Sequence, residues 1–145
     1  MKKLISTLVI AAAAISGGLA HAQTASTILV EFQGPGGHSS GNYGRTSALH
    51  AAARSVMALQ KAGLPAGSYA VTDLTGGNSV NSIASDGKFV ATLNAQSGVA
   101  AADFLAKVTE AAKTGTDAEN AFRNVKPGDL TAGAPADIRY TVKPQ

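Results

Sequence analysis

The amino-acid sequence predicts an α+β protein, in which a four-stranded antiparallel sheet carries two helices on one face. The expected order of elements is the β-α-β-β-α-β of a ferredoxin-like sandwich. Residues 27–32 and 138–142 alternate in side-chain character, as half-buried strands do, and residues 69–75 and 88–93 are strand-like segments next to turn-forming residues. Two longer segments repeat apolar residues every three or four positions, as amphipathic helices do. We therefore expect a single domain over residues 23–145.

The four expected strands are residues 27–32, 69–75, 88–93 and 138–142. The first shows the pattern most clearly, because Ile28, Val30 and Phe32 fall on one side of an extended chain. The second and third follow each other closely and are expected to pair antiparallel. Asp86 and Gly87, just before the third strand, are predicted to form a turn.

The first helix is expected to begin after Thr46 or Ser47, since either hydroxyl can cap its first turn. Gly63 and Pro65 predict its end, because glycine often closes a helix and proline cannot continue one. The apolar residues that recur at helical spacing, and therefore form the predicted core face, are Leu49, Ala52, Ala53 and Val56.

The second helix is expected over residues 99–113, with its end at Gly115. Its predicted core face consists of Ala101, Phe104, Leu105, Val108 and Ala112. Residues 116–135 contain two prolines and two glycines, which predict an irregular connection with at most a short helix near residues 118–123.

The N-terminus has the pattern of a secretory signal peptide. Lys2 and Lys3 precede an uncharged, mostly apolar run, and small residues follow at Ala20 and Ala22. The run is shorter than the roughly 20 residues that a membrane-spanning helix needs, so a retained anchor is the less favoured alternative. We expect residues 1–22 to be removed by cleavage after Ala22, which leaves a periplasmic or secreted protein without a membrane anchor.

Charge and cysteine content exclude several classes of protein. The formal net charge is +3, of which Lys2 and Lys3 supply two, and no stripe of basic residues is interleaved with aromatic ones. This composition argues against a nucleic-acid partner. The chain has no cysteine, so an exported form depends on its hydrophobic core instead of on disulfides.

Two glycine-containing segments carry a family resemblance. Residues 36–45 read Gly-Gly-His-Ser-Ser and, after three further residues, Gly-Arg; residues 76–81 read Gly-Gly-Asn-Ser-Val-Asn. In this order they resemble the lid, or dimerisation, domain of the co-catalytic zinc peptidase superfamily. That superfamily includes carboxypeptidase G, succinyl-diaminopimelate desuccinylase and aminoacylase enzymes. The resemblance covers residues 27–113.

The resemblance implies roles for individual residues. It places His38 where the family's loop histidine reaches across a dimer and stabilises the oxyanion that develops on a substrate. Asn81 would point toward the same substrate, and Gly36, Gly37 and Ser39 would complete the candidate binding loop. The competing interpretation is structural, with His38 bracing the glycine loop and Asn81 holding a turn through hydrogen bonds.

The sequence departs from the family in two respects. It lacks the His-x-Asp arrangement and the paired glutamates of a co-catalytic zinc site, so we expect no metal, no cofactor and no catalysis by this chain alone. Asn94 stands where the family's third strand commonly ends in arginine. Recognition of a substrate carboxylate is therefore expected to differ.

The favoured function is a non-catalytic, exported homodimerisation module. The strand Tyr69–Thr75 carries a single charge, and together with the first helix it is expected to pair with a second copy. Two alternatives stay open. One is a lid that acts in trans on, or regulates, a separate exported zinc peptidase; the other is a small-ligand or peptide binder that uses the glycine-rich residues 34–41.

Overall fold

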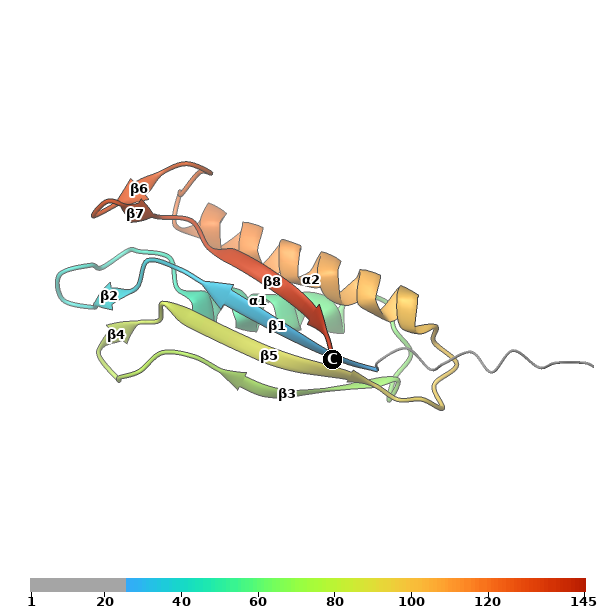
Figure 1. Ribbon diagram of the computed structural model, residues 1–145. Coiled ribbons are helices and arrows are strands. Elements are labelled where there is room, and N and C mark those ends of the chain that lie inside the picture. Colours follow the sequence, from blue (N-terminus) through green and yellow to red (C-terminus); the bar gives the residue numbers. More distant parts are fainter. Residues whose placement is uncertain (1–25) are drawn as a thin grey trace, which may run out of the picture.

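The computed structural model describes residues 26–145, and Figure 1 shows how their elements are arranged. The predicted signal peptide and its cleavage site lie outside these residues. One sheet contains the four long strands β1 (Thr27–Gln33), β3 (Tyr69–Thr75), β5 (Asp86–Leu93) and β8 (Arg139–Pro144). Their order across the sheet is β3-β5-β1-β8, and every neighbouring pair is antiparallel. The predicted α+β, ferredoxin-like fold is confirmed.

Two helices cover one face of the sheet, and the other face is open (Figure 1). α1 (Ala48–Gln60) lies over β5 and β3, whereas α2 (Ala101–Phe122) lies over β8. β3 and β8 are therefore the edges of the sheet, each beside a different helix. None of the described helices is both long and apolar enough to cross a membrane.

The hydrophobic core lies between the sheet and the helices. In β1, Ile28, Val30 and Phe32 are buried and alternate with more exposed residues, as predicted. The rings of Phe32 and Phe89 stack with their centroids 6.0 Å apart, and Phe104 of α2 is buried in the same cluster. Burial of each such side chain contributes about 1.5–3 kcal/mol to stability, so this face defines which side of the sheet the helices cover.

α1 begins after Ser47, whose hydroxyl accepts a hydrogen bond from the backbone N–H of His50 at 3.4 Å. Of its predicted core face only Ala52 is buried, because the buried side of the helix is rotated by about one residue from the predicted side. The buried residues are Ala48, Ala51, Ala52, Ser55 and Leu59. Leu49, Ala53 and Val56 lie on a flank of the helix and are only half-buried. Where α1 packs closely against the sheet and α2, small residues such as alanine and serine are needed. A search for apolar residues at helical spacing does not identify them.

α2 continues past Gly115, where its end was predicted, and includes residues that were expected to form a separate short helix. Gly115 is buried at the crossing with α1. A Cβ atom on it would lie 2.1 Å from Ser55 Oγ and 2.3 Å from the Ser55 backbone nitrogen. The glycine therefore allows the two helices to approach closely, and this packing outweighs its low helix propensity.

Asp86 and Gly87 were predicted to form a turn, but they are the first two residues of β5. Gly87 pairs with Phe32 of β1. A Cβ atom on Gly87 would lie 2.6 Å from the carbonyl oxygen of Ala48, at the start of α1. As at Gly115, the missing side chain makes room for a neighbouring backbone.

A buried carboxylate joins the two helices. Glu119 of α2 is fully buried, and it accepts hydrogen bonds from the Ser47 backbone N–H and from Arg54 Nε, both at 3.0 Å. Arg123 Nε donates a third at 3.3 Å. A buried charge is stable only when it is paired and hydrogen-bonded in this way. The network fixes the last turns of α2 against the start of α1.

The connection from α2 to β8 was predicted to be irregular. Besides the end of α2, it contains a short hairpin formed by β6 (Leu130–Thr131) and β7 (Ala134–Pro135). The backbone N–H of Ile138 donates to Asn120 Oδ1 at 2.8 Å, and Asn120 Nδ2 donates to the Ile138 carbonyl at 3.4 Å. These bonds hold the connection against α2 before β8 begins.

Candidate functional site at the loop end of the sheet

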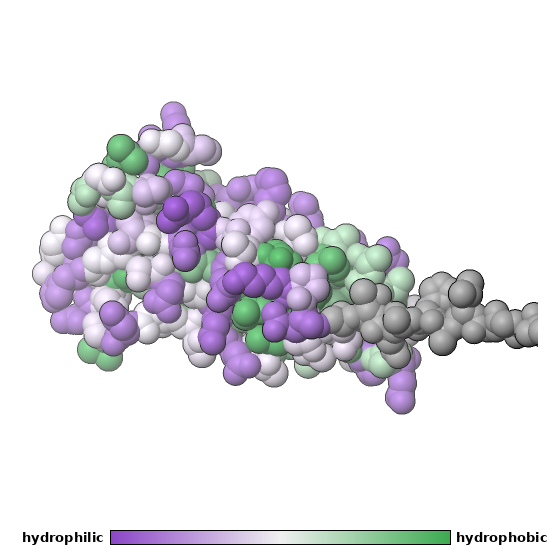
Figure 2. Space-filling view, viewed as in Figure 1, coloured by the Kyte–Doolittle hydropathy of each residue, from purple (hydrophilic) through white to green (hydrophobic). Residues whose placement is uncertain are grey.

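Three connections meet at one end of the sheet, here named the loop end: residues 34–47, 76–85 and 123–138 (Figure 1). They follow β1, join β3 to β5, and join α2 to β8. In Figure 2 the surface at this end is mostly pale or hydrophilic, in keeping with its many glycine, serine and asparagine residues. All five residues that the family resemblance singled out lie here.

A two-stranded ladder shapes the first of these connections. β2 (Gly37–His38) pairs with β4 (Ser82–Ile83), so that His38 lies opposite Ser82. Gly36 and Gly37 have φ angles of 63° and 142°, which side chains disfavour. A Cβ atom on Gly36 would also lie 2.7 Å from Ser85 Cβ. The two glycines are therefore required to place the His38 backbone beside β4.

The structure brings His38 and Asn81 together, although 43 residues separate them. Asn81 Nδ2 lies 3.0 Å from His38 Nε2, and Asn81 Oδ1 accepts a hydrogen bond from Ser79 Oγ at 2.8 Å. On the other side of the ring, Ser40 Oγ lies 2.7 Å from His38 Nδ1. The Ser40 backbone N–H also donates to His38 Nδ1, at 3.3 Å, so that each ring nitrogen has a polar neighbour within hydrogen-bond distance.

These contacts hold the imidazole in one orientation while leaving it exposed. Ser39 contributes through its backbone, whose N–H donates to the Asn81 carbonyl at 2.9 Å. His38 and Asn81 line an open hollow of about 290 Å³, where an imidazole and an amide could both contact a polar group. Within residues 26–145, no three His, Asp or Glu side chains are grouped so as to hold a metal ion.

Asn94, which stands where the family commonly has arginine, lies at the opposite end of β5 from the loop end. Its backbone N–H donates to the Ser68 carbonyl at 2.8 Å, and its Nδ2 donates to the Gly67 carbonyl at 3.3 Å. Within one copy of the chain, Asn94 therefore does not contribute to the site around His38.

Sequence reasoning missed a larger groove at the loop end, of about 570 Å³, between residues 41–46 and the hairpin β6–β7. Tyr43 and Leu130 line it and are 93% and 69% exposed. Arg45 and Asp129 line it as well. The groove was not predicted because one of its sides, the hairpin β6–β7, lies within residues that were expected to be irregular. A sequence rich in turn residues does not indicate which other segment the chain folds back against.

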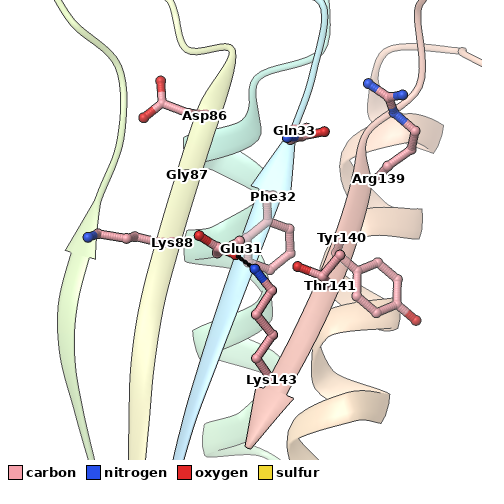
Figure 3. Close-up of a pocket in the computed structure, with 10 residues that line it drawn as sticks. All are labelled: Glu31, Phe32, Gln33, Asp86, Gly87, Lys88, Arg139, Tyr140, Thr141 and Lys143. Carbon is pink, nitrogen blue, oxygen red and sulfur yellow. Dashed lines mark hydrogen bonds and ion pairs between the residues drawn. The ribbon is translucent and has the colours of Figure 1, made fainter. Parts of the chain in front are cut away.

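The open face of the sheet carries a third hollow, also of about 290 Å³ (Figure 3). Glu31 and Lys143 face each other there, with Lys143 Nζ 2.5 Å from Glu31 Oε2. Lys88 points away from this pair toward β3, and Arg139 lies near the start of β8 (Figure 3). Charges of both signs are interspersed, as is typical of the solvated face of an antiparallel sheet.

Comparison with solved structures supports the fold. An amidase of the hydantoinase/carbamoylase family from Burkholderia vietnamiensis superposes with a TM-score of 0.57 at 16% identity, over 81% of this chain and 26% of that one. The aminobenzoyl-glutamate utilization protein from Klebsiella pneumoniae gives a TM-score of 0.54 at 16% identity, over 83% and 27%. This chain thus spans about a quarter of the length of either protein. No curated protein matches it.

The sequence itself matches a family model. The model describes the peptidase dimerisation domain, and the match covers residues 21–120, which is more than half of the chain. It includes both loop-end segments that carried the resemblance, residues 36–45 and 76–81, and most of α2. The chain therefore belongs to the peptidase dimerisation domain family.

Proposed function

We propose that this chain is an exported, non-catalytic homodimerisation module, and that two copies associate through β3 and α1. A single observation carries this proposal. The open edge of the sheet at β3 lies on the same side of the molecule as an apolar flank of α1 that a single copy leaves half-exposed.

The flank of α1 consists of Leu49, Ala53 and Val56, spaced to lie on one side of a helix. At about 100° per residue, this side is roughly a quarter turn from the buried stripe. Arg54 and Ser55 face α2, since Arg54 binds Glu119 and Ser55 contacts Gly115. The flank therefore faces away from α2, toward the β3 edge.

The edge strand offers a short stretch for pairing. Residues 69–72 of β3 pair regularly with β5, and the register then shifts by one residue before Thr75. Asp73, within this bulge, has a positive φ of 55°. A bulge twists a strand and ends regular pairing, so the first half of β3 is the part best suited to a second copy.

A two-fold arrangement would use both features at once. In an isologous contact each copy presents the same surface, so β3 pairs with β3 and the α1 flanks meet above the joined sheets. Pairing satisfies the exposed backbone groups of the edge, and contact between the flanks removes apolar surface from water.

Light scattering of the purified protein tests the proposal. We expect twice the chain mass at micromolar concentrations, and the chain mass for Ala53→Glu, because it buries a charge in the contact. Ala106→Glu, at an exposed position of α2, is the matched control and should stay dimeric. A monomeric natural chain, or a folded Ala53→Glu variant that stays dimeric, would contradict the proposed contact. Circular dichroism establishes that each variant is folded.

Export is proposed on the N-terminal sequence pattern alone. Expression of the full chain in a Gram-negative host, followed by mass spectrometry of the periplasmic fraction, is the direct test. The expected product begins at Gln23. Recovery of the uncleaved chain from the cytoplasm would contradict export without bearing on the dimer.

A second candidate function is a lid that acts in trans on a separate exported zinc peptidase. The observation that favours it is the exposed pair of His38 and Asn81, which the loop end holds 3.0 Å apart. If this function is correct, His38→Ala changes the rate of a co-purifying peptidase, whereas His50→Ala, on α1, does not. Equal rates with and without the natural chain would exclude it. Binding of a small ligand at this pair, lost in His38→Ala, would favour the third candidate, a glycine-loop binder.

A further inference from the structure

We propose that the groove between residues 41–46 and the hairpin β6–β7 binds a zwitterion, namely an amino acid or short peptide with a free ammonium and a free carboxylate. Its volume of about 570 Å³ suits a ligand of that size. Neither β3 nor the flank of α1 lines it, so this inference is independent of the proposed dimer.

Arg45 provides the cationic side of the groove. Its guanidinium is half-buried and donates through Nη1 to the Gly36 carbonyl at 3.0 Å, which fixes its position. Among residues 26–145, no carboxylate lies within ion-pair distance of it. A guanidinium has five N–H donors, so most of them stay available, and their planar geometry matches a carboxylate.

Asp129 provides the anionic side. Its Oδ2 accepts a hydrogen bond from the backbone N–H of Lys126 at 2.7 Å, and it forms no ion pair with Arg45 or with any other described residue. Two opposite charges that line one groove without pairing can each pair with a ligand. Because they balance, a simple anion or cation would meet one unfavourable partner, which selects for a ligand carrying both charges.

The walls of the groove are anchored before any ligand arrives. Thr46 Oγ1 donates to the Ala136 carbonyl at 2.6 Å in a buried contact between the two walls. The Ala136 backbone N–H donates to the Asp129 carbonyl at 2.9 Å. Such preorganisation lowers the entropic cost of binding. The exposed Tyr43 and Leu130 supply apolar surface for a ligand side chain.

The test compares three forms of one dipeptide by calorimetry and by NMR titration: free alanyl-leucine, its N-acetyl derivative and its C-terminal amide. We expect saturable binding of the free dipeptide, weakened about tenfold or more when either charged end is blocked, because each block removes a charge-assisted hydrogen bond. Absence of saturable binding up to about 10 mM, or equal binding of the blocked forms, would overturn the proposal.

Variants locate the site. Arg45→Gln and Asp129→Asn are each expected to weaken binding of the free dipeptide about tenfold, and the latter keeps the acceptor that Lys126 needs. The matched controls are Arg139→Gln and Asp86→Asn, outside the groove, which should bind as the natural chain does. If Arg45→Gln proves unfolded, Asp129→Asn still decides. Binding that survives both groove variants, or that only His38→Ala removes, would overturn the proposal.

Discussion

The two edge strands of the sheet, β3 and β8, differ in the features that favour or oppose pairing with a further strand. β3 carries a single charged residue, Asp73, and lies on the side of the half-exposed flank of α1. β8 carries Arg139 and Lys143 and ends in Pro144, which has no backbone N–H to donate. Charged residues and proline are the devices by which natural sheets discourage pairing at an edge.

This contrast determines what kind of assembly the fold permits. A sheet with two receptive edges could add copies without limit, whereas one receptive edge allows a single isologous contact and then stops. In the proposed dimer the sequence of β8 would therefore matter as much as that of β3, because it would stop further copies from adding to the sheet.

The largest effect is expected from a substitution that changes the position of α1 over the sheet. Gly115→Ala places a Cβ against the Ser55 backbone, so the helices must separate. Overpacking of this kind lowers the free energy of unfolding by about 1–3 kcal/mol. Urea unfolding measures the loss, and light scattering should show a weaker dimer because the flank of α1 moves. Gly41→Ala is the control, since its Cβ would meet nothing within 4 Å. Equal losses in the two variants would show that the helix crossing is not tightly packed.

A smaller effect is expected from making β3 resemble β8. Thr72→Lys adds a cation to the exposed, regularly paired part of β3. In a two-fold contact the two lysines repel, and the dimer should weaken about tenfold. The same change at Thr141, on β8, should leave the dimer dissociation constant unchanged. Sedimentation at several concentrations distinguishes these outcomes, and equal effects at both sites would remove the distinction between the edges.

Making β8 resemble β3 is the reverse experiment. Lys143→Thr together with Pro144→Thr removes a charge and restores a backbone N–H on the outer edge. We expect species larger than a dimer to appear as the protein concentration rises. If the double variant keeps the mass of the natural chain at all concentrations, the two residues do not protect the edge.

The smallest effect concerns pH. Tyr69 of β3 packs against Phe104 with ring centroids 5.8 Å apart, and burial raises the pKa of its phenol above 10.0. The unfolded chain therefore loses this proton first. The protonated Tyr69 phenol therefore favours the folded chain. This contribution to the free energy of unfolding is complete below about pH 10 and is lost as the pH rises through the folded-state pKa. Tyr69→Phe removes this phenol, whereas the control Tyr43→Phe changes an exposed ring and leaves it in place. As the pH is raised in the alkaline range, the measured free energy of unfolding should therefore fall less for Tyr69→Phe than for Tyr43→Phe.

Much of the fold could be predicted because strand alternation is a strong signal. The pattern of β1 located its buried side, and β3 has the predicted bounds. Besides the core face of α1, two predictions were wrong: Gly87 is not in a turn, and Gly115 does not end a helix. Both glycines make room for a neighbouring helix backbone, and such a contact depends on tertiary packing that a local pattern does not contain.

The candidate site was predictable only as a set of residues. The motifs identified His38 and Asn81, but the hydrogen bond between them depends on pairing of β2 with β4 across more than forty residues. Arg45 belonged to a motif without a role assigned to it. Its relation to Asp129 becomes visible only when the hairpin β6–β7 folds back over the loop end.

The position of β1 in the sheet has a consequence for folding. β1 is the first strand of the chain, yet it pairs with β5 on one side and with β8 on the other. The ion pair between Lys143 and Glu31 spans a sequence separation of 112 residues. Contacts this distant slow folding, because a long loop must close before they form. During synthesis from the N-terminus, β1 can pair with β5 once residues 86–93 have emerged, but its other edge stays unpaired until β8, residues 139–144, follows.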